Sequence, residues 1–324
     1  MQTRIVQTDG LKQQILEAGA NDGSAPLVLL IHGFPELGIS WRAQVAALAE
    51  AGYHAVAPDM RGYGGTDKPE RVENYSILHL VGDMVDLVRA LGETTCTVVG
   101  HDWGAPVAWH CALMRPDVFT AVAGLSVPFQ PRSPKGPPTA LMRGLSERLG
   151  LGEFYISQFQ TPDAHLDFEA DVAGALRRGF YAYDGATPDD RRSTGFLAPG
   201  QTFLSAVPDD AALPPWMGES HFREYVAAFT ASGFRGPLDW YRCIDLNWRL
   251  TAHLQNRRIA VPAVFLVGER DPVRVYAGQH EAGLKDWIPD LRSQTVLPGA
   301  GHWLQQERPE EVNAALIAFL KTSK

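Results

Sequence analysis

The chain has no apolar run long enough to cross a membrane, and its first residues do not resemble a targeting signal. A membrane-spanning helix needs roughly 18 consecutive apolar residues, and no stretch of this sequence approaches that length. The N-terminal residues MQTRIVQTDG lack the apolar core of a secretory signal peptide. We therefore expect neither a membrane span nor a signal peptide.

Cysteine is scarce in this sequence. The three cysteines, Cys96, Cys111 and Cys243, are scattered, and none lies in a C-x-x-C pair. This pattern argues against a disulfide framework and against a zinc site. Since unpaired thiols are typical of a reducing compartment, we expect a cytoplasmic protein without a metal site.

The sequence also has no excess of basic charge. Its 324 residues include 29 Lys and Arg against 37 Asp and Glu, a net charge of −8. Without a basic stripe, we expect no nucleic-acid partner. Apolar residues make up 45% of the chain, which excludes a disordered protein. The length suits two domains or one enlarged α/β domain.

Strand-like and helix-like segments alternate towards both ends of the sequence. Residues 27–31 (LVLLI) form a continuous apolar run, typical of a strand that is buried on both faces. Further strands are predicted at 53–57, 95–99, 119–127, 263–267 and 294–297, and helices at 77–91, at 105–114 and from Pro309 onwards. This alternation predicts an α/β fold, in which helices cover a mainly parallel sheet.

The middle of the chain follows a different pattern. Residues 131–138 (PRSPKGPP) cannot form a helix or a central strand, and no strand pattern appears between there and about Trp248. Of the 31 Phe, Tyr and Trp residues, 17 lie between Phe154 and Trp248. We expect a helical subdomain with its own core and an aromatic-lined pocket that faces the sheet.

One motif lies where a strand is followed by a helix. Residues 100–104 read Gly-His-Asp-Trp-Gly, and small residues at Gly100 and Gly104 permit a tight turn that lifts Asp102 above the sheet edge. Such an elbow usually carries a serine nucleophile, and here it carries an aspartate. The pentapeptide alone also fits a helix-capping Asp.

Three other segments follow predicted strands. They are HGFPE at 32–36, GERD at 268–271 and GAGHW at 299–303. The order of Asp102, an acid in the second segment and His302 is that of the α/β-hydrolases, with Asp in place of Ser. Both Glu269 and Asp271 are candidates for the acid.

From Ile31 to Leu320 the sequence resembles the epoxide hydrolases of the α/β-hydrolase fold. The loop at 32–35 is similar to the family's H-G-x-P loop, residues 59–66 (DMRGYGGT) to its D-x-R-G-x-G-x-S/T turn, and residues 100–105 to its nucleophile motif. The resemblance implies an α/β-hydrolase core at 1–130 and 250–324, with a helical cap inserted at 131–249. A cis peptide bond is expected between Phe34 and Pro35.

Two segments of the middle region extend the resemblance. Residues 233–242 (GFRGPLDWYR) look like the family's lid motif, whose tyrosine would be Tyr241, and residues 154–160 (FYISQFQ) are similar to the segment with the other lid tyrosine, Tyr155. The resemblance implies that both phenols donate hydrogen bonds to the epoxide oxygen and that one passes its proton to it as the ring opens.

An aspartate nucleophile restricts the chemistry. It can displace a leaving group at a saturated carbon and become an ester. The resemblance implies that Asp102 opens an epoxide and that His302, oriented by Asp271, takes a proton from the water that cleaves the ester. The expected product is a vicinal diol, formed without a cofactor.

The resemblance also implies the residues that surround this chemistry. The backbone N–H groups of Phe34 and Trp103 would stabilise the oxyanion. The residues expected to shape the site are His32, Gly33, Pro35, Gly100 and Gly104.

Two alternative functions stay open at this point. Haloalkane dehalogenases share the fold, and Trp103 suits a halide, but Phe34 occupies a position where many dehalogenases carry Asn. The pair of lid tyrosines favours an epoxide, because an alkoxide leaving group needs an acid and a halide does not. A non-catalytic binding protein of the same fold is the second alternative. The expected substrates are water and a small, mostly apolar epoxide, and the oligomeric state stays open.

Overall fold

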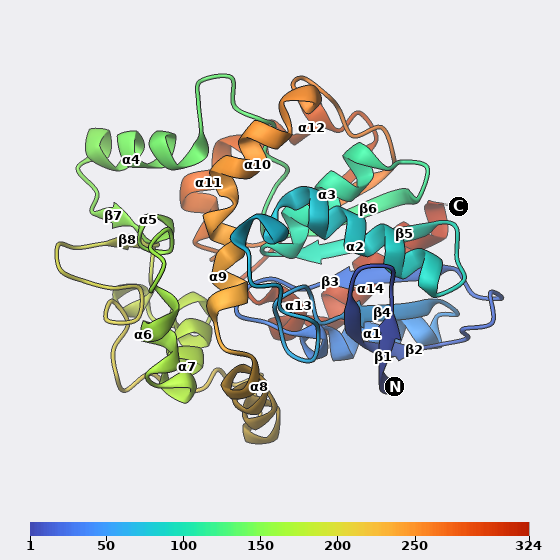
Figure 1. Ribbon diagram of the computed structural model, residues 1–324, viewed down its shortest axis with the longest axis horizontal. Helices are drawn as coiled ribbons and strands as arrows, with labels where there is room; N and C mark the ends of the chain where they lie inside the picture. The colour runs from blue at the N-terminus through green and yellow to red at the C-terminus, as the bar shows by residue number, and fades with distance from the viewer. Residues whose placement is uncertain (324) are drawn as a thin grey trace.

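An eight-stranded sheet forms the centre of the computed structural model, which describes residues 1–323 (Figure 1). The strand order is β1-β2-β4-β3-β5-β6-β9-β10. The strands are β1 (Gln2–Gln7), β2 (Lys12–Ala18), β3 (Leu27–Ile31), β4 (His54–Pro58), β5 (Cys96–His101), β6 (Phe119–Leu125), β9 (Ala263–Gly268) and β10 (Leu291–Leu297). β2 pairs antiparallel with both β1 and β4, and every other neighbouring pair is parallel. The predicted mainly parallel sheet is confirmed.

The most apolar strands are those that the sequence reveals best. Every residue of β3, β4 and β9 is buried, because helices cover both faces of a parallel sheet. No strand was predicted before residue 27, and β1 and β2 are therefore findings of the structure. The buried positions of β2 are Gln13, Ile15 and Glu17, and two polar residues out of three hide the apolar alternation that marks a strand.

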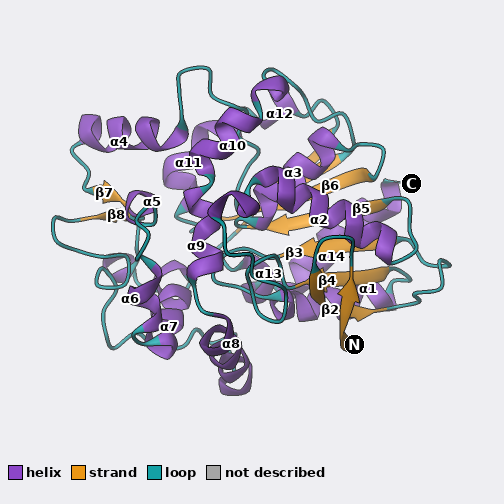
Figure 2. Cartoon of the chain, viewed as in Figure 1, coloured by secondary structure: helices purple, strands orange, loops and turns teal. Residues whose placement is uncertain are grey.

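Helices pack on both sides of this sheet (Figure 2). Those of the core are α1 (Arg42–Glu50), α2 (Ile77–Ala90), α3 (Gly104–Met114), α11 (Val273–Ala282), α12 (Leu284–Trp287), α13 (Leu304–Glu307) and α14 (Pro309–Thr322). The three helices predicted here agree with α2, α3 and α14 to within one residue at the ends that were predicted. Among the residues that the structure describes, no helix is both long and apolar enough to span a membrane.

The segment between β6 and β9 contributes no strand to the central sheet and lies beside it in Figure 1. Its helices are α4 (Pro138–Leu149), α5 (Tyr155–Gln158), α6 (His165–Glu169), α7 (Val172–Tyr183), α8 (Glu219–Ser232), α9 (Arg235–Arg242) and α10 (Ile244–Leu250). The expectation of no strand here was wrong, since β7 (Glu153–Phe154) and β8 (Phe196–Leu197) form an antiparallel pair. Two-residue strands are too short to show any alternation. The cap boundaries at residues 131 and 249 stay a prediction.

Candidate active site

Asp102 lies on the turn between β5 and α3. Its backbone φ is 51°, a left-handed conformation that non-glycine residues seldom adopt. A Cβ atom at Gly100 would lie 2.0 Å from the carbonyl oxygen of Gly104, and a Cβ at Gly104 would lie 2.1 Å from that of Ile31. Gly100 therefore permits the tight turn that presents the Asp102 carboxylate above the sheet, and Gly104 permits the close approach of this turn to β3.

The loop after β3 approaches this carboxylate directly. The backbone N–H of Phe34 donates a hydrogen bond of 2.8 Å to Asp102 Oδ1, and a Cβ at Gly33 would lie 2.3 Å from the same oxygen. His32 holds the loop, because its Nδ1 lies 2.9 Å from the carbonyl oxygen of Gly33 and its Nε2 accepts from the N–H of Met60 at 2.9 Å. The Phe34–Pro35 peptide bond is cis, as predicted.

His302 lies between two carboxylates. Its Nε2 is 3.3 Å from Asp102 Oδ2, and its Nδ1 is 3.1 Å from Asp271 Oδ1. Glu269, the other candidate for the acid, instead accepts a hydrogen bond of 2.9 Å from the N–H of Gly299. The structure thus brings Asp102, His302 and Asp271 together at the carboxyl ends of the strands, where ligands bind in open α/β sheets.

One member of this group was not identified from the sequence. Ser126 follows β6, and its Oγ lies 2.9 Å from His302 Nδ1. The backbone φ of Ser126 is 70°, which turns its side chain towards the Asp271–His302 pair. A single serine at the end of a strand is not a recognisable motif. Its contact with His302 follows only from the strand order, which places β6 beside β9.

Burial and charge act in opposite directions on the three ionisable groups. Burial lowers the pKa of His302, but the negative charge of Asp271 and the hydrogen bond to Asp102 outweigh it and raise that pKa well above its usual value. Burial raises the pKa of Asp102, but the hydrogen bond and charge of His302 outweigh it and hold that pKa below its usual value. The free site therefore contains an imidazolium between two carboxylates.

This ion pair predicts the effect of removing one carboxylate. In Asp102→Asn the loss of charge should lower the pKa of His302 towards the ordinary value of about 6.5, so the imidazolium loses its proton at a lower pH. An NMR titration of the His302 ring measures this pKa directly. Asp209→Asn, at an exposed carboxylate, should leave it unchanged. An unchanged titration in Asp102→Asn would contradict the electrostatic description.

A second buried group supports the backbone of His302. Glu36 is completely buried and lies 2.7 Å from His101 Nδ1. The other ring nitrogen of His101 is 2.8 Å from the carbonyl oxygen of His302, and Gln305 and Gln306 each donate to Glu36 at 2.9 Å. No role was predicted for Glu36, whose one signal in the sequence is a carboxylate in the short loop that follows β3.

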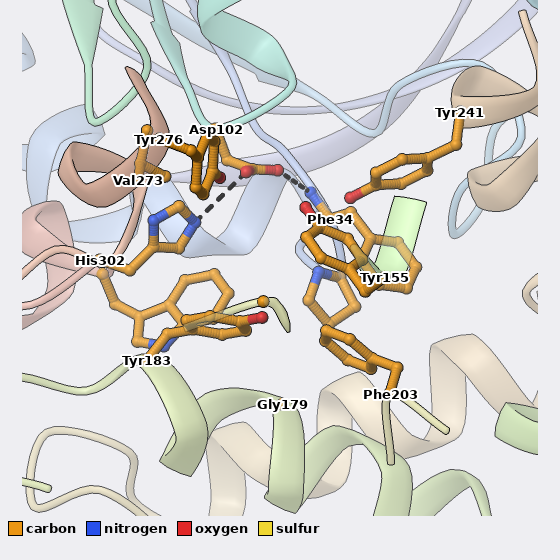
Figure 3. Close-up of a pocket in the computed structure, with 13 residues that line it drawn as sticks. Phe34, Asp102, Tyr155, Gly179, Tyr183, Phe203, Tyr241, Val273, Tyr276 and His302 are labelled. Atoms are coloured by element: carbon orange, nitrogen blue, oxygen red, sulfur yellow. Dashed lines mark hydrogen bonds and ion pairs between the residues drawn. The ribbon is translucent and has the colours of Figure 1, made fainter. Parts of the chain in front are cut away.

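The two predicted lid tyrosines line the same cavity as Asp102 (Figure 3). Tyr155 begins α5, Tyr241 lies in α9, and their ring centroids are 6.1 Å apart. The Tyr241 ring packs edge-on against Phe34 and Trp103, at centroid distances of 5.6 and 5.1 Å. Both side chains therefore face the same space as Asp102.

Burial favours the neutral form of both phenols. It raises the pKa of Tyr155 well above its usual value, and the charges of Tyr183 and Asp102 raise it further. Burial likewise raises the pKa of Tyr241, with contributions from Tyr155 and Asp102. Both hydroxyls hence carry their protons at neutral pH and can act as hydrogen-bond donors.

Two cavities meet at Asp102. The smaller, of about 30 Å³, includes Pro35, Phe203, His302 and Trp303 in its lining. The larger, of about 660 Å³, is bordered by Trp103 and Trp109 and continues along α4 and α10. The residues that line both are Asp102, Tyr155, Tyr241 and Tyr276. A carboxylate and three phenols thus surround the point where the two cavities meet.

Comparison with known proteins identifies the family to which this chain belongs. Residues 26–309 match the model of a family described as the alpha/beta hydrolase fold. The chain is 44% identical to Epoxide hydrolase A of Mycobacterium tuberculosis over 98% of this chain and 96% of that protein. It is 39% identical to Epoxide hydrolase 3 of Siraitia grosvenorii over 97% of this chain and 96% of that protein.

Solved structures give the same result. The crystal structure of Epoxide Hydrolase A from Mycobacterium thermoresistibile superposes with a TM-score of 0.91 at 44% identity, covering 99% of this chain and 98% of that one. An epoxide hydrolase from an endophytic Streptomyces superposes with a TM-score of 0.92 at 40% identity, covering 99% of this chain and 95% of that one.

Proposed function

The chain belongs to the α/β-hydrolase fold family and is an epoxide hydrolase, and from this premise we propose that Asp102 opens the epoxide through a covalent aspartyl ester. The observation that carries the proposal is the Asp102 carboxylate itself. One oxygen accepts the Phe34 N–H at 2.8 Å, and the other lies 3.3 Å from His302. The opposite wall of the cavity presents the Tyr155 and Tyr241 phenols.

In the first step, a carboxylate oxygen of Asp102 attacks a ring carbon of the epoxide. A bond forms between that oxygen and the carbon while the ring C–O bond breaks. The departing oxygen takes the proton of a lid phenol, which becomes a phenolate. Charge on this oxygen grows only as the ring opens, so the phenols stabilise the transition state more than the bound substrate.

The ester then changes the protonation of His302. Ester formation removes the negative charge of Asp102, one of the groups that raise the pKa of His302. The imidazolium can now return a proton to the phenolate, which leaves His302 neutral. Neutral Nε2 is the form that can accept a proton from water, while Asp271 holds the ring by its Nδ1–H.

In the second step, water adds to the ester carbonyl and His302 takes its proton. The Phe34 N–H already donates to Asp102 Oδ1, where it supports the negative charge of the tetrahedral intermediate, and we propose the Trp103 N–H as the second donor. The intermediate collapses to the diol and the Asp102 acid, and the alcohol oxygen takes its proton from His302. The proton of the acid then passes to His302 and restores the ion pair.

The larger cavity supports a mostly apolar epoxide as the substrate. Its volume of about 660 Å³ falls in the range typical of small-molecule sites. Its lining includes Trp103, Trp109, Leu113 and Phe154. The comparisons name epoxide hydrolases and so do not favour a dehalogenase or a non-catalytic binding protein.

Location and macromolecular partners remain predictions from the composition. The three cysteines are buried and unpaired, which supports a reducing, cytoplasmic location. The net charge of −8 supports the absence of a nucleic-acid partner.

A single turnover in heavy-oxygen water tests the covalent mechanism. With enzyme in excess, the first diol should carry an oxygen from Asp102, and the label should appear in the peptide that contains Asp102. Mass spectrometry of both products measures this. Heat-inactivated enzyme treated in parallel should show no label in that peptide. Label that enters the first diol directly would mean that water attacks the epoxide, and would overturn the role of Asp102 as nucleophile.

A further inference from the structure

Glu307 is a carboxylate behind the histidine loop that takes no part in the steps above. It is the last residue of α13, five residues after His302, and it is not among the residues that line the two cavities. Its side chain nevertheless binds the backbone on both sides of His302. Oε2 accepts the N–H of Gly301 at 2.7 Å, and Oε1 accepts the N–H of Trp303 at 3.0 Å.

The same carboxylate also joins this loop to the segment between β6 and β9. Glu307 Oε2 accepts another hydrogen bond, from the N–H of Gly185 at 3.1 Å. Tyr183, the last residue of α7, accepts the N–H of His302 at its carbonyl oxygen, at 2.9 Å, and its ring lies beside the His302 ring (Figure 3). The N–H groups of residues 301, 302 and 303 are thus all bound, two by Glu307 and one by the end of α7.

Two glycines allow the backbones to approach each other here. A Cβ at Gly301 would lie 2.3 Å from the backbone nitrogen of Gly185. A Cβ at Gly185 would lie 2.4 Å from the carbonyl oxygen of Gly299 and 2.6 Å from Glu307 Oε2. The histidine loop and the segment after α7 are therefore in direct backbone contact at the point where Glu307 binds both.

The pattern of hydrogen bonds requires a carboxylate at this position. The N–H donors need acceptors on both oxygens of the side chain, whereas the amide of glutamine has one acceptor oxygen and would direct an NH2 group at a donor. Burial raises the pKa of Glu307 to about 7, and the charge of Asp184 also raises it, against the lowering effect of the hydrogen bonds. At mildly alkaline pH the side chain is therefore ionised and can accept from all its donors.

Ester formation changes what holds the His302 ring. In the free site the ring lies between two carboxylates, 3.3 Å from Asp102 and 3.1 Å from Asp271. Once Asp102 has become an ester, its ion pair with the ring is lost, and the ring is held at Nδ1 and through its own backbone. Ester hydrolysis therefore depends more strongly on the position of this backbone than ester formation does.

We propose that Glu307 is a positioning residue for ester hydrolysis, which fixes the backbone of His302 so that Nε2 stays directed at the water that attacks the Asp102 ester. Glu307 does not touch the substrate, and it exchanges no proton in either step. This inference rests on the proposed function, because it requires a covalent ester and a histidine base.

The test is Glu307→Gln, assayed at mildly alkaline pH. Rapid quench with a chromogenic aryl epoxide gives the rates of ester formation and ester hydrolysis separately. Ester hydrolysis should slow by ~10-fold or more, the order expected for hydrogen bonds to a charged group, and ester formation should change by less than ~2-fold. The amount of ester in the initial burst counts the folded active sites. A loss of stability alone would therefore lower the burst and leave both rate constants unchanged.

A matched control and a second variant accompany this test. Glu310→Gln removes the same charge from an exposed position in the first turn of α14, and it should leave both rates within ~2-fold of the wild type. If Glu307→Gln formed no ester burst, Glu307→Asp would be measured in the same way. It keeps both acceptor oxygens but withdraws them by one methylene, so it should be slow in the same step.

A double-substitution cycle determines whether Glu307 acts through His302. In the His302→Gln background, ester hydrolysis no longer uses an imidazole, so adding Glu307→Gln should change its slow rate by less than ~2-fold. The decay of the covalent adduct, followed by intact-protein mass spectrometry, measures this rate.

The possible failures are distinguishable. A wild-type rate of ester hydrolysis in Glu307→Gln, or the same loss with and without His302, would overturn the proposal. Equal slowing of both steps would show that Glu307 supports the whole site rather than hydrolysis, and would also overturn it. If the wild-type enzyme formed no covalent ester, the proposed function would fail, and this inference with it.

Discussion

His302→Gln enzyme mixed with excess epoxide is expected to accumulate a covalent adduct on Asp102 and then to stop. Glutamine cannot take a proton from water, so ester hydrolysis should slow by ~100- to 10,000-fold, the usual contribution of a general base. The attack on the epoxide needs only the ionised carboxylate and the lid phenols, so the ester should still form. Intact-protein mass spectrometry should show one added epoxide mass for each chain.

Two conditions make this experiment decisive. The charge of His302 lowers the pKa of Asp102, so the variant is assayed at mildly alkaline pH, where the carboxylate stays ionised without this help. The matched control combines His302→Gln with Asp102→Ala and should show no adduct. A His302→Gln enzyme that loses diol formation without accumulating any adduct would contradict the two-step mechanism.

The double substitution Tyr155→Phe with Tyr241→Phe is expected to lose nearly all ring opening. Each single substitution leaves one phenol in place, and we expect it to slow ester formation by ~10- to 1000-fold, within the range of a general acid. Removing both leaves the alkoxide without a donor in a buried site, where unpaired charge is costly. Pre-steady-state kinetics with excess enzyme measures ester formation separately from hydrolysis.

The rate of ester hydrolysis in the same variants provides the control for this prediction. Hydrolysis of an ester that has already formed should change far less, because the proposed mechanism assigns that step to His302 and Asp271. If the double variant formed the ester at the wild-type rate, the two phenols would serve only as packing. The haloalkane dehalogenase alternative would then regain support, since a halide leaves without an acid.

Short motifs and apolar runs in the sequence were enough to predict most of the fold and most of the candidate site. The strand at 27–31 was predictable because a strand buried on both faces is apolar at every position. The elbow was predictable because a Cβ at Gly100 would meet the carbonyl oxygen of Gly104 within the same tight turn around Asp102. These are local requirements, and a local requirement leaves a local pattern.

Other features had no local pattern to reveal them. β2 buries Gln13 and Glu17, because neighbouring strands and helix α2 supply partners that the sequence alone does not show. Glu17 lies 2.6 Å from the Arg4 guanidinium and 3.1 Å from the His54 ring. The alternation of buried and less buried residues in β2 is therefore that of a strand, but its many polar residues are typical of a surface segment.

By itself, the sequence determined that this chain is an α/β hydrolase, and it predicted Asp102 as the nucleophile, His302 as the base and Tyr155 and Tyr241 as lid tyrosines. Only the tertiary structure decided that Glu36 supports the backbone of His302 through His101 and that Ser126 and Tyr276 join the reaction centre. The physical reason is that these contacts connect residues far apart in the chain. They depend on strand order and on the packing of separate elements, which no spacing along the sequence records.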